Sequence, residues 1–175
     1  MMSLKMLRKL SRLRLFLAII FFAGPVFQIH AQPGKNGQLR MTKNEILTAK
    51  SSDSTAPGSS NASGVQVIVI HGDPSAKGLY TILLKVAAHT TIAAHLHPDD
   101  RVATVIEGTW YFGYGDAFNK SKLKKLSAGS IYTEVEGQNH FAMTHETPVV
   151  VEITGYGPSG VTYVNTANDP KKSKN

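Results

Sequence analysis

Short runs of β-branched and aromatic residues alternate with turn residues from residue 65 onward. The runs recur about every 8 to 12 residues, and Gly, Pro, Asp and Asn lie between them. Regular short strands with turn signals, and no convincing amphipathic helix, predict an all-β sandwich or barrel. The one helical candidate, residues 117–126, is too basic and too short to build a core on. The expected strands cover residues 65–70, 79–87, 102–107, 109–114, 130–136, 140–144, 149–154 and 161–164.

The chain before residue 65 has a different pattern. Residues 32–64 contain few large apolar side chains, and residues 50–64 are nearly all small or polar, which is typical of a flexible linker. Residues 41–49 fit a short helix or an edge strand, and the pattern does not decide between them. We therefore expect a flexible segment at 32–64, one β-barrel domain at 65–165 and a basic tail at 166–175.

A basic segment followed by an apolar run opens the chain. Five basic residues lie within the first 14 positions, and residues 15–27 are almost wholly apolar. Ala31 then provides a small residue at a plausible cleavage position, so residues 1–31 have the pattern of a secretory signal peptide. A membrane anchor is the alternative, but the apolar run falls short of the ~20 residues that a spanning helix needs. We expect a secreted or periplasmic protein without stable membrane insertion after cleavage.

The charge distribution argues against a nucleic-acid partner. The 175 residues include 19 Lys and Arg against 12 Asp and Glu, a net charge of +7. Because five of the basic residues fall in the signal peptide, residues 32–175 carry 14 basic and 12 acidic residues and a net charge of +2. That excess is too small for a surface that tracks phosphates. The chain has no cysteine, which excludes disulfides, thiolate metal sites and thiol nucleophiles.

Three histidines carry the candidate chemistry. His95 and His97 are two residues apart, so on a strand both side chains project to the same face, which suits two ligands of one metal ion. His140 follows a Gly-Gln-Asn sequence at the start of a later run, where a turn would aim it into the mouth of a barrel. Neutral imidazoles suit iron, zinc, nickel or manganese far better than calcium. The pattern predicts a divalent metal site and leaves the identity of the metal open.

The sequence around these histidines resembles the two motifs of the cupin superfamily. Residues 95–108 read HLHPDDRVATVIEG and resemble the first motif, in which HxH is followed by a glutamate and, seven positions later, by a glycine. Residues 129–140 read GSIYTEVEGQNH and resemble the second motif, with two glycines and a histidine. The resemblance implies a cupin-type double-stranded β-helix, or jelly-roll, barrel in which His95, His97 and His140 bind the metal. A homodimer is an expectation from the family alone.

Arg101 departs from the family pattern. It stands seven positions before Gly108, where the family has its glutamate ligand, and an arginine stays protonated and cannot ligate a cation. The site then has three histidines alone, or no metal, or Asp99 or Asp100 as a substitute carboxylate. Three neutral ligands leave more positive charge on a bound ion, so the site should favour anionic substrates. A guanidinium in the same cavity would bind a carboxylate or phosphate, which makes Arg101 the candidate catalytic residue.

Two aromatic residues are candidates for shaping a substrate pocket. Trp110 shares its strand parity with Gly108 and is expected to face the barrel interior, and Tyr132 lies on a later run. Three-histidine cupins resemble non-haem iron dioxygenases, so the family implies an oxygenase-like or isomerase-like enzyme that acts on a small anionic molecule. The alternative is a non-catalytic cupin that binds a small ligand or a sugar, with a structural metal or none. The fold class does not decide between the two.

Overall fold

The structure is a computed structural model that describes residues 37–50 and 56–172. The predicted signal peptide, residues 1–31, lies outside the described residues and stays a prediction. In the described part of the chain, no helix is both long enough and apolar enough to cross a membrane.

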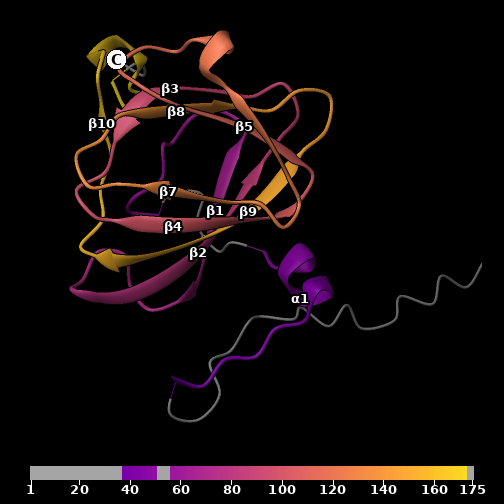
Figure 1. Ribbon diagram of the computed structural model, residues 1–175. Coiled ribbons are helices and arrows are strands. Elements are labelled where there is room, and N and C mark those ends of the chain that lie inside the picture. The colour runs from indigo at the N-terminus through magenta and orange to yellow at the C-terminus, as the bar shows by residue number, and fades with distance from the viewer. Residues whose placement is uncertain (1–36, 51–55, 173–175) are drawn as a thin grey trace, which may run out of the picture.

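Two antiparallel sheets of five strands face each other and form a barrel (Figure 1). In chain order the elements are α1 (Lys43–Thr48), β1 (Val65–His71), β2 (Gly78–Val86), β3 (Thr91–Leu96), β4 (Arg101–Glu107), β5 (Thr109–Tyr114), η2 (Lys120–Lys122), β6 (Lys124–Ser127), β7 (Ile131–Glu134), β8 (His140–Met143), β9 (Val149–Gly157), β10 (Thr162–Tyr163) and η3 (Thr166–Asn168). Sheet A has the order β1-β2-β9-β4-β7, and sheet B has the order β10-β3-β8-β5-β6. The predicted all-β barrel is confirmed.

Alternating side chains along the strands build one core between the two sheets. In β9, Val149, Val151 and Ile153 are buried, whereas the residues between them are only partly buried. Successive side chains of a strand point to opposite faces, so every second residue is enough to line the interior. Removing each such side chain from water stabilises the fold by roughly 1.5–3 kcal/mol. This core fixes the positions of the strands that carry the histidines.

All eight predicted strands are present, with ends that shift by a few residues, but the pattern misses β3 and β6. β3 has the sequence TIAAHL, and its two alanines and histidine weaken the β signal. β6 has the sequence KKLS and lies at the edge of sheet B, where charged residues are common. The helical candidate at 117–126 is wrong, because the short 3-10 helix η2 and then β6 occupy these positions.

Residues 41–49 contain the helix α1 and not an edge strand, which were the two alternatives from the sequence. The helix packs on the outside of the barrel (Figure 1). Thr42 caps its N-terminus, and the Glu45 carboxylate accepts a hydrogen bond from the Thr42 backbone N–H at 2.6 Å. Ile46 packs against a small cluster that includes Leu83, on the outer face of sheet A. Lys85 Nζ donates to two carbonyl oxygens at the C-terminal end of the helix, at 2.6 and 2.7 Å.

Residues 56–64 lie against the barrel instead of forming a detached linker. Ser59 and Ser60 are only 1% and 5% exposed. The backbone turns on itself, because the Ser59 N–H bonds the Ala56 carbonyl and the Val65 N–H bonds the Ala62 carbonyl, both at 3.1 Å. The linker interpretation of 32–64 is therefore wrong for these residues and for α1. Small polar residues are typical of linkers, but they also fit a tight turn in a narrow space.

Two glycines of the motifs stand in tight turns with the same left-handed backbone. Gly108 joins β4 to β5 with a φ of 84°, and Gly129 precedes β7 with a φ of 86°. A Cβ on Gly108 would collide with the Pro148 carbonyl oxygen, whereas a Cβ on Gly129 would meet nothing within 4 Å. Gly108 is thus required by backbone conformation and by space, and Gly129 by conformation alone.

Substitution by alanine separates these two requirements. We expect Gly129→Ala to lower the free energy of unfolding by about 1–2 kcal/mol, the cost of a left-handed backbone for an L-residue. Gly108→Ala should cost about 1–3 kcal/mol more, because the turn must also move away from Pro148. Urea unfolding of both variants measures the difference, and equal losses would contradict the steric role of Gly108.

Candidate metal centre

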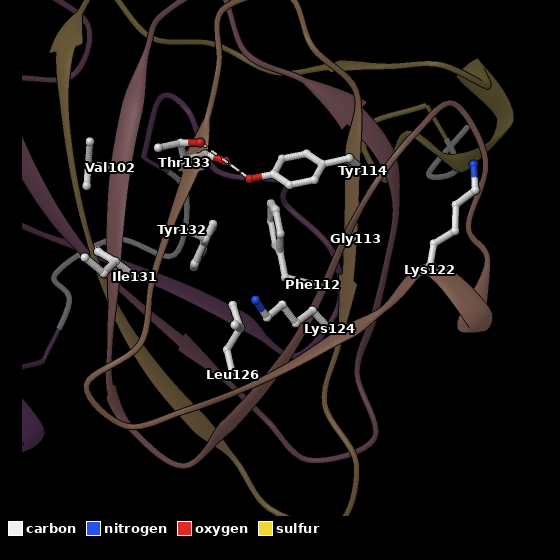
Figure 2. Close-up of a pocket in the computed structure, with 10 residues that line it drawn as sticks. All are labelled: Val102, Phe112, Gly113, Tyr114, Lys122, Lys124, Leu126, Ile131, Tyr132 and Thr133. Carbon is white, nitrogen blue, oxygen red and sulfur yellow. Dashed lines mark hydrogen bonds between the residues drawn. The ribbon is translucent and has the colours of Figure 1, made fainter.

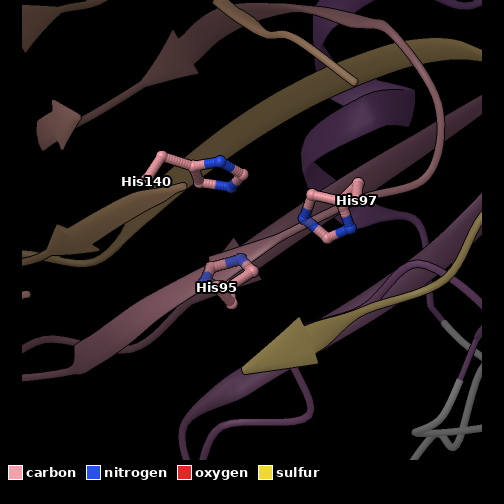
Figure 3. A group of neighbouring side chains, drawn as sticks. All are labelled: His95, His97 and His140. Atoms are coloured by element: carbon pink, nitrogen blue, oxygen red, sulfur yellow. The ribbon is translucent and has the colours of Figure 1, made fainter. Parts of the chain in front are cut away.

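Three buried histidines from sheet B point toward one another inside the barrel (Figure 3). His95 lies in β3 and is paired across the ladder with His140, the first residue of β8. His97 follows the end of β3 and has the same parity as His95. The ring centroids lie 4.4 to 5.1 Å apart, and one nitrogen from each ring lies within 4.8 Å of the other two. The structure brings together the three side chains that the sequence singled out.

Backbone carbonyls hold the outer nitrogen of each ring. Nδ1 of His95 lies 2.8 Å from the Ala93 carbonyl oxygen, and Nδ1 of His140 lies 3.2 Å from that of Gln138. Nδ1 of His97 makes a short hydrogen bond with the Gly160 carbonyl oxygen. A carbonyl only accepts, so these bonds assign the proton to Nδ1 and leave the Nε2 lone pair free. Metal-binding histidines use the same arrangement to fix the tautomer and the ring orientation.

The interior keeps the imidazoles of His95 and His140 in their neutral form. Burial, aided by the neighbouring His140, lowers the pKa of His95 to about 3. Burial also lowers the pKa of His140, although the Glu134 carboxylate opposes the shift. At neutral pH both rings are therefore uncharged, which is the form that binds a metal ion.

Glu134 is the carboxylate of this centre, and the sequence analysis missed it. Its Oε1 lies 3.7 Å from His140 Nε2, and its Oε2 lies 3.7 Å from His97 Nε2. Glu134 ends β7, in which Tyr132 and Glu134 are buried whereas Ile131 and Thr133 are exposed. The available signal was its parity with Tyr132 on a predicted strand. Asp99 and Asp100 were the candidate carboxylates instead, because they lie next to the HxH motif in the sequence.

Asp99 and Asp100 do not replace the missing ligand. The Asp99 carboxylate accepts hydrogen bonds from Tyr80 Oη at 2.6 Å and from Ser159 Oγ at 2.7 Å. Burial raises the pKa of Asp99, and the two hydroxyl groups partly offset that rise. Asp100 is exposed and accepts a hydrogen bond from the Glu136 backbone N–H at 2.8 Å. Of the alternatives that the sequence leaves open, the structure does not support a substitute aspartate, because the carboxylate beside the histidines comes from another strand.

The Arg101 guanidinium binds two groups of its own chain, the Glu134 carboxylate and the Gly58 carbonyl. It lies opposite Glu134 in the β4–β7 ladder, and its Nη2 is 2.7 Å from Glu134 Oε2. Its Nη1 donates to the Gly58 carbonyl oxygen at 3.0 Å. Burial is the largest single influence on Glu134 and opposes its ionisation, but Arg101, aided by His140 and His95, outweighs it and holds the pKa of this carboxyl below its usual value. Arg101 and Glu134 thus form a buried ion pair that offsets the positive charge expected from Arg101 alone, and the catalytic role of Arg101 stays a prediction.

Residues 58–60, the mouth segment, cover the centre on one side. Tyr163 Oη donates to the Ser60 carbonyl oxygen at 2.6 Å, and Arg101 binds the segment through Gly58. The remaining cavity has a volume of about 20 Å³ and is lined by the three histidines, Arg101, Glu134 and the mouth segment, among others. A space of this size holds one water-sized group. The cavity does not admit a substrate-sized molecule while the mouth segment is in place.

Several buried polar atoms around the centre lack a hydrogen-bonding partner. Among the described residues they include His140 Nε2, Trp110 Nε1 and Tyr132 Oη. Trp110 lines the cavity, in agreement with its expected inward direction, and Tyr132 lies against Phe112 with 4.1 Å between ring centroids. Buried polar atoms normally have partners, so unpartnered ones next to three histidines indicate room for a bound group. A metal ion would satisfy His140 Nε2, and the donor set therefore fits a metal.

The Arg101–Glu134 pair can be tested by a double-mutant cycle in chelator-treated protein. We expect Arg101→Met and Glu134→Gln each to lower the free energy of unfolding by about 3–5 kcal/mol, because each leaves a buried group without its partner. The double variant should lose much less than the sum. The exposed pair Lys43–Glu107, at 3.3 Å, is the matched control, and its coupling should be only about 0–1 kcal/mol. Additive losses at Arg101 and Glu134 would refute the coupling.

Comparison with known proteins identifies the fold. No protein-family model matches the sequence, and no curated protein matches it. The polyketide cyclase RemF from Streptomyces resistomycificus is similar in structure over 76% of this chain and 89% of its own, with 16% identity and a TM-score of 0.58. A conserved protein with a double-stranded β-helix domain from Klebsiella pneumoniae is similar over 73% of this chain and 97% of its own, with 19% identity and a TM-score of 0.51. Together with the two motifs on these strands, the likeness shows that this chain has the double-stranded β-helix fold.

Proposed function

We propose that the protein binds one divalent metal ion through Nε2 of His95, His97 and His140. The observation that carries this proposal is the carbonyl contact at each Nδ1, which leaves three Nε2 lone pairs in one buried space. Histidine nitrogens suit iron, zinc, nickel and manganese. The Glu134 carboxylate lies beside two of these nitrogens, and its charge is balanced by Arg101.

Metal analysis of the purified, untagged protein tests this site. We expect about one equivalent of metal per chain in the unaltered protein and almost none in a His95→Ala/His140→Ala variant, since each lost imidazole removes a ligand. His71→Ala/His145→Ala, which removes two histidines outside the cluster, is the matched control and should keep its metal. Added metal should also raise the melting temperature of the unaltered protein and not that of the first variant. Equal metal content in both variants would refute the site.

We further propose that the metal centre is that of an oxygenase-like enzyme acting on a small molecule. A bound metal with open coordination positions supplies activation of substrate and dioxygen. The chain's own residues supply the surroundings: Trp110 lines the cavity, and Ile92 and Ile153 are apolar walls that limit water. A dioxygenase places both atoms of O₂ in its product, so the reaction balances without an external reductant. The cyclase RemF, with the same fold, supports catalysis in this kind of barrel only by analogy.

A non-catalytic binding protein is the second candidate. It is favoured by one observation, the mouth segment that reduces the inner cavity to about 20 Å³. In that case the metal has a structural role, and the ligand binds elsewhere on the barrel.

Oxygen uptake by the iron-loaded protein separates the two candidates. With a panel of small carboxylic acids and diketones, the enzyme hypothesis predicts O₂ consumption in a 1:1 ratio with the substrate consumed. The His95→Ala/His140→Ala variant should be inactive because it cannot hold the iron. If the loaded protein consumes no oxygen with any member of the panel, the binding protein becomes the better account.

A further inference from the structure

An open groove lies on the side of the barrel, between the free edges of the two sheets (Figure 2). β7 ends sheet A and β6 ends sheet B, and the two strands are not paired with each other. The space between them, which we call the side groove, has a volume of about 520 Å³. Small-molecule pockets typically have ≈ 300–1,000 Å³, so this space can take a substrate-sized molecule, whereas the inner cavity cannot. Its apolar lining includes Val102, Phe112, Leu126, Ile131 and Tyr132.

Lysines provide the charge of the side groove. Lys124 is the cross-strand partner of Phe112, and Leu126 is that of Trp110, so Lys124 and Leu126 share the inward face of β6. Figure 2 shows the Lys124 side chain extending over the groove beside Phe112. Lys122 lies at the rim. Neither ammonium group has a carboxylate partner among the described residues, so a negative charge in the groove would meet unpaired cations.

One aromatic layer separates the side groove from the histidines. Phe112 lines both the groove and the inner cavity. Its ring stacks on His140 with 5.4 Å between centroids and packs against Tyr132 at 4.1 Å. A molecule in the groove would therefore rest against the wall of the metal centre, next to Lys124.

We infer that the side groove binds a small amphipathic carboxylate. Its aromatic or aliphatic body would pack on Phe112, Leu126 and Ile131, and its carboxylate would pair with Lys124. This inference concerns a binding site separate from the metal centre and does not rest on the proposed function. The competing explanation is that Lys124 only guards an edge strand against pairing with another chain, since charged residues on edge strands have that effect.

Titration calorimetry on the full chain, with the metal removed by a chelator, tests the groove separately from the metal centre. The probes are benzoate, 2-naphthoate and octanoate, with neutral 2-naphthamide as the uncharged match for 2-naphthoate. We expect at least one carboxylate to bind, and the amide to bind about tenfold more weakly because it lacks the charge-assisted hydrogen bond. Lys124→Gln should weaken that carboxylate by about tenfold, again through the lost charged partner.

Two variants provide the controls. Lys125→Gln alters the next residue of β6, which points to the opposite face, and should leave affinity unchanged. Ile131→Glu places a negative charge at the groove on a side chain that is 68% exposed, so it should fold normally and bind the carboxylate more weakly.

Three outcomes would overturn the inference: no carboxylate binds, the amide binds as well as the acid, or Lys124→Gln and Lys125→Gln weaken binding equally. Self-association of Lys124→Gln without a change in affinity would support the edge-guard explanation instead. Metal content measured in parallel keeps the two proposals distinct. If the untreated protein contains no metal but the chelator-treated protein binds the carboxylate, only the metal site is refuted. If the untreated protein contains metal but the chelator-treated protein binds no carboxylate, only the groove is refuted.

Discussion

A charged arginine inside a barrel needs a carboxylate beside it, and the pairing of Arg101 with Glu134 meets that need at the centre of this protein. The pair forms across neighbouring strands, β4 and β7, in a fixed register. Side chains alternate between faces, so a slip of one residue would move Glu134 to the solvent and leave Arg101 buried alone. The register of this sheet edge and the charge balance of the interior therefore depend on each other.

The same ion pair connects three features that are distant in sequence. Glu134 lies between Arg101 and two of the histidines, so it brings a negative charge to the imidazole cluster. Arg101 also binds the Gly58 carbonyl and holds the mouth segment over the cavity. Related barrels are expected to have a glutamate at the position of Arg101. Here the carboxylate stands on the adjacent strand, and Arg101 neutralises its charge.

The barrel is closed at its mouth and open along its side. Residues 58–60 leave an inner space of about 20 Å³, whereas the unpaired edges of β6 and β7 leave about 520 Å³. The Phe112 side chain lines both the inner space and the side groove. Cupin-fold barrels support unrelated activities, so the function of this one depends on what these two spaces admit and not on the fold.

The sequence by itself determined the all-β class, eight of the strands and the three histidines. Alternating apolar residues, turn glycines and an HxH spacing are local signals, and each can be recognised without knowledge of which strands become neighbours. Tertiary structure alone decided the rest. Glu134 reaches the histidine cluster only because β7 pairs with β4, and residues 56–64 lie against the barrel only because its mouth offers them partners. Such contacts join residues far apart in the chain, and no local pattern of polarity or composition encodes which partners will meet.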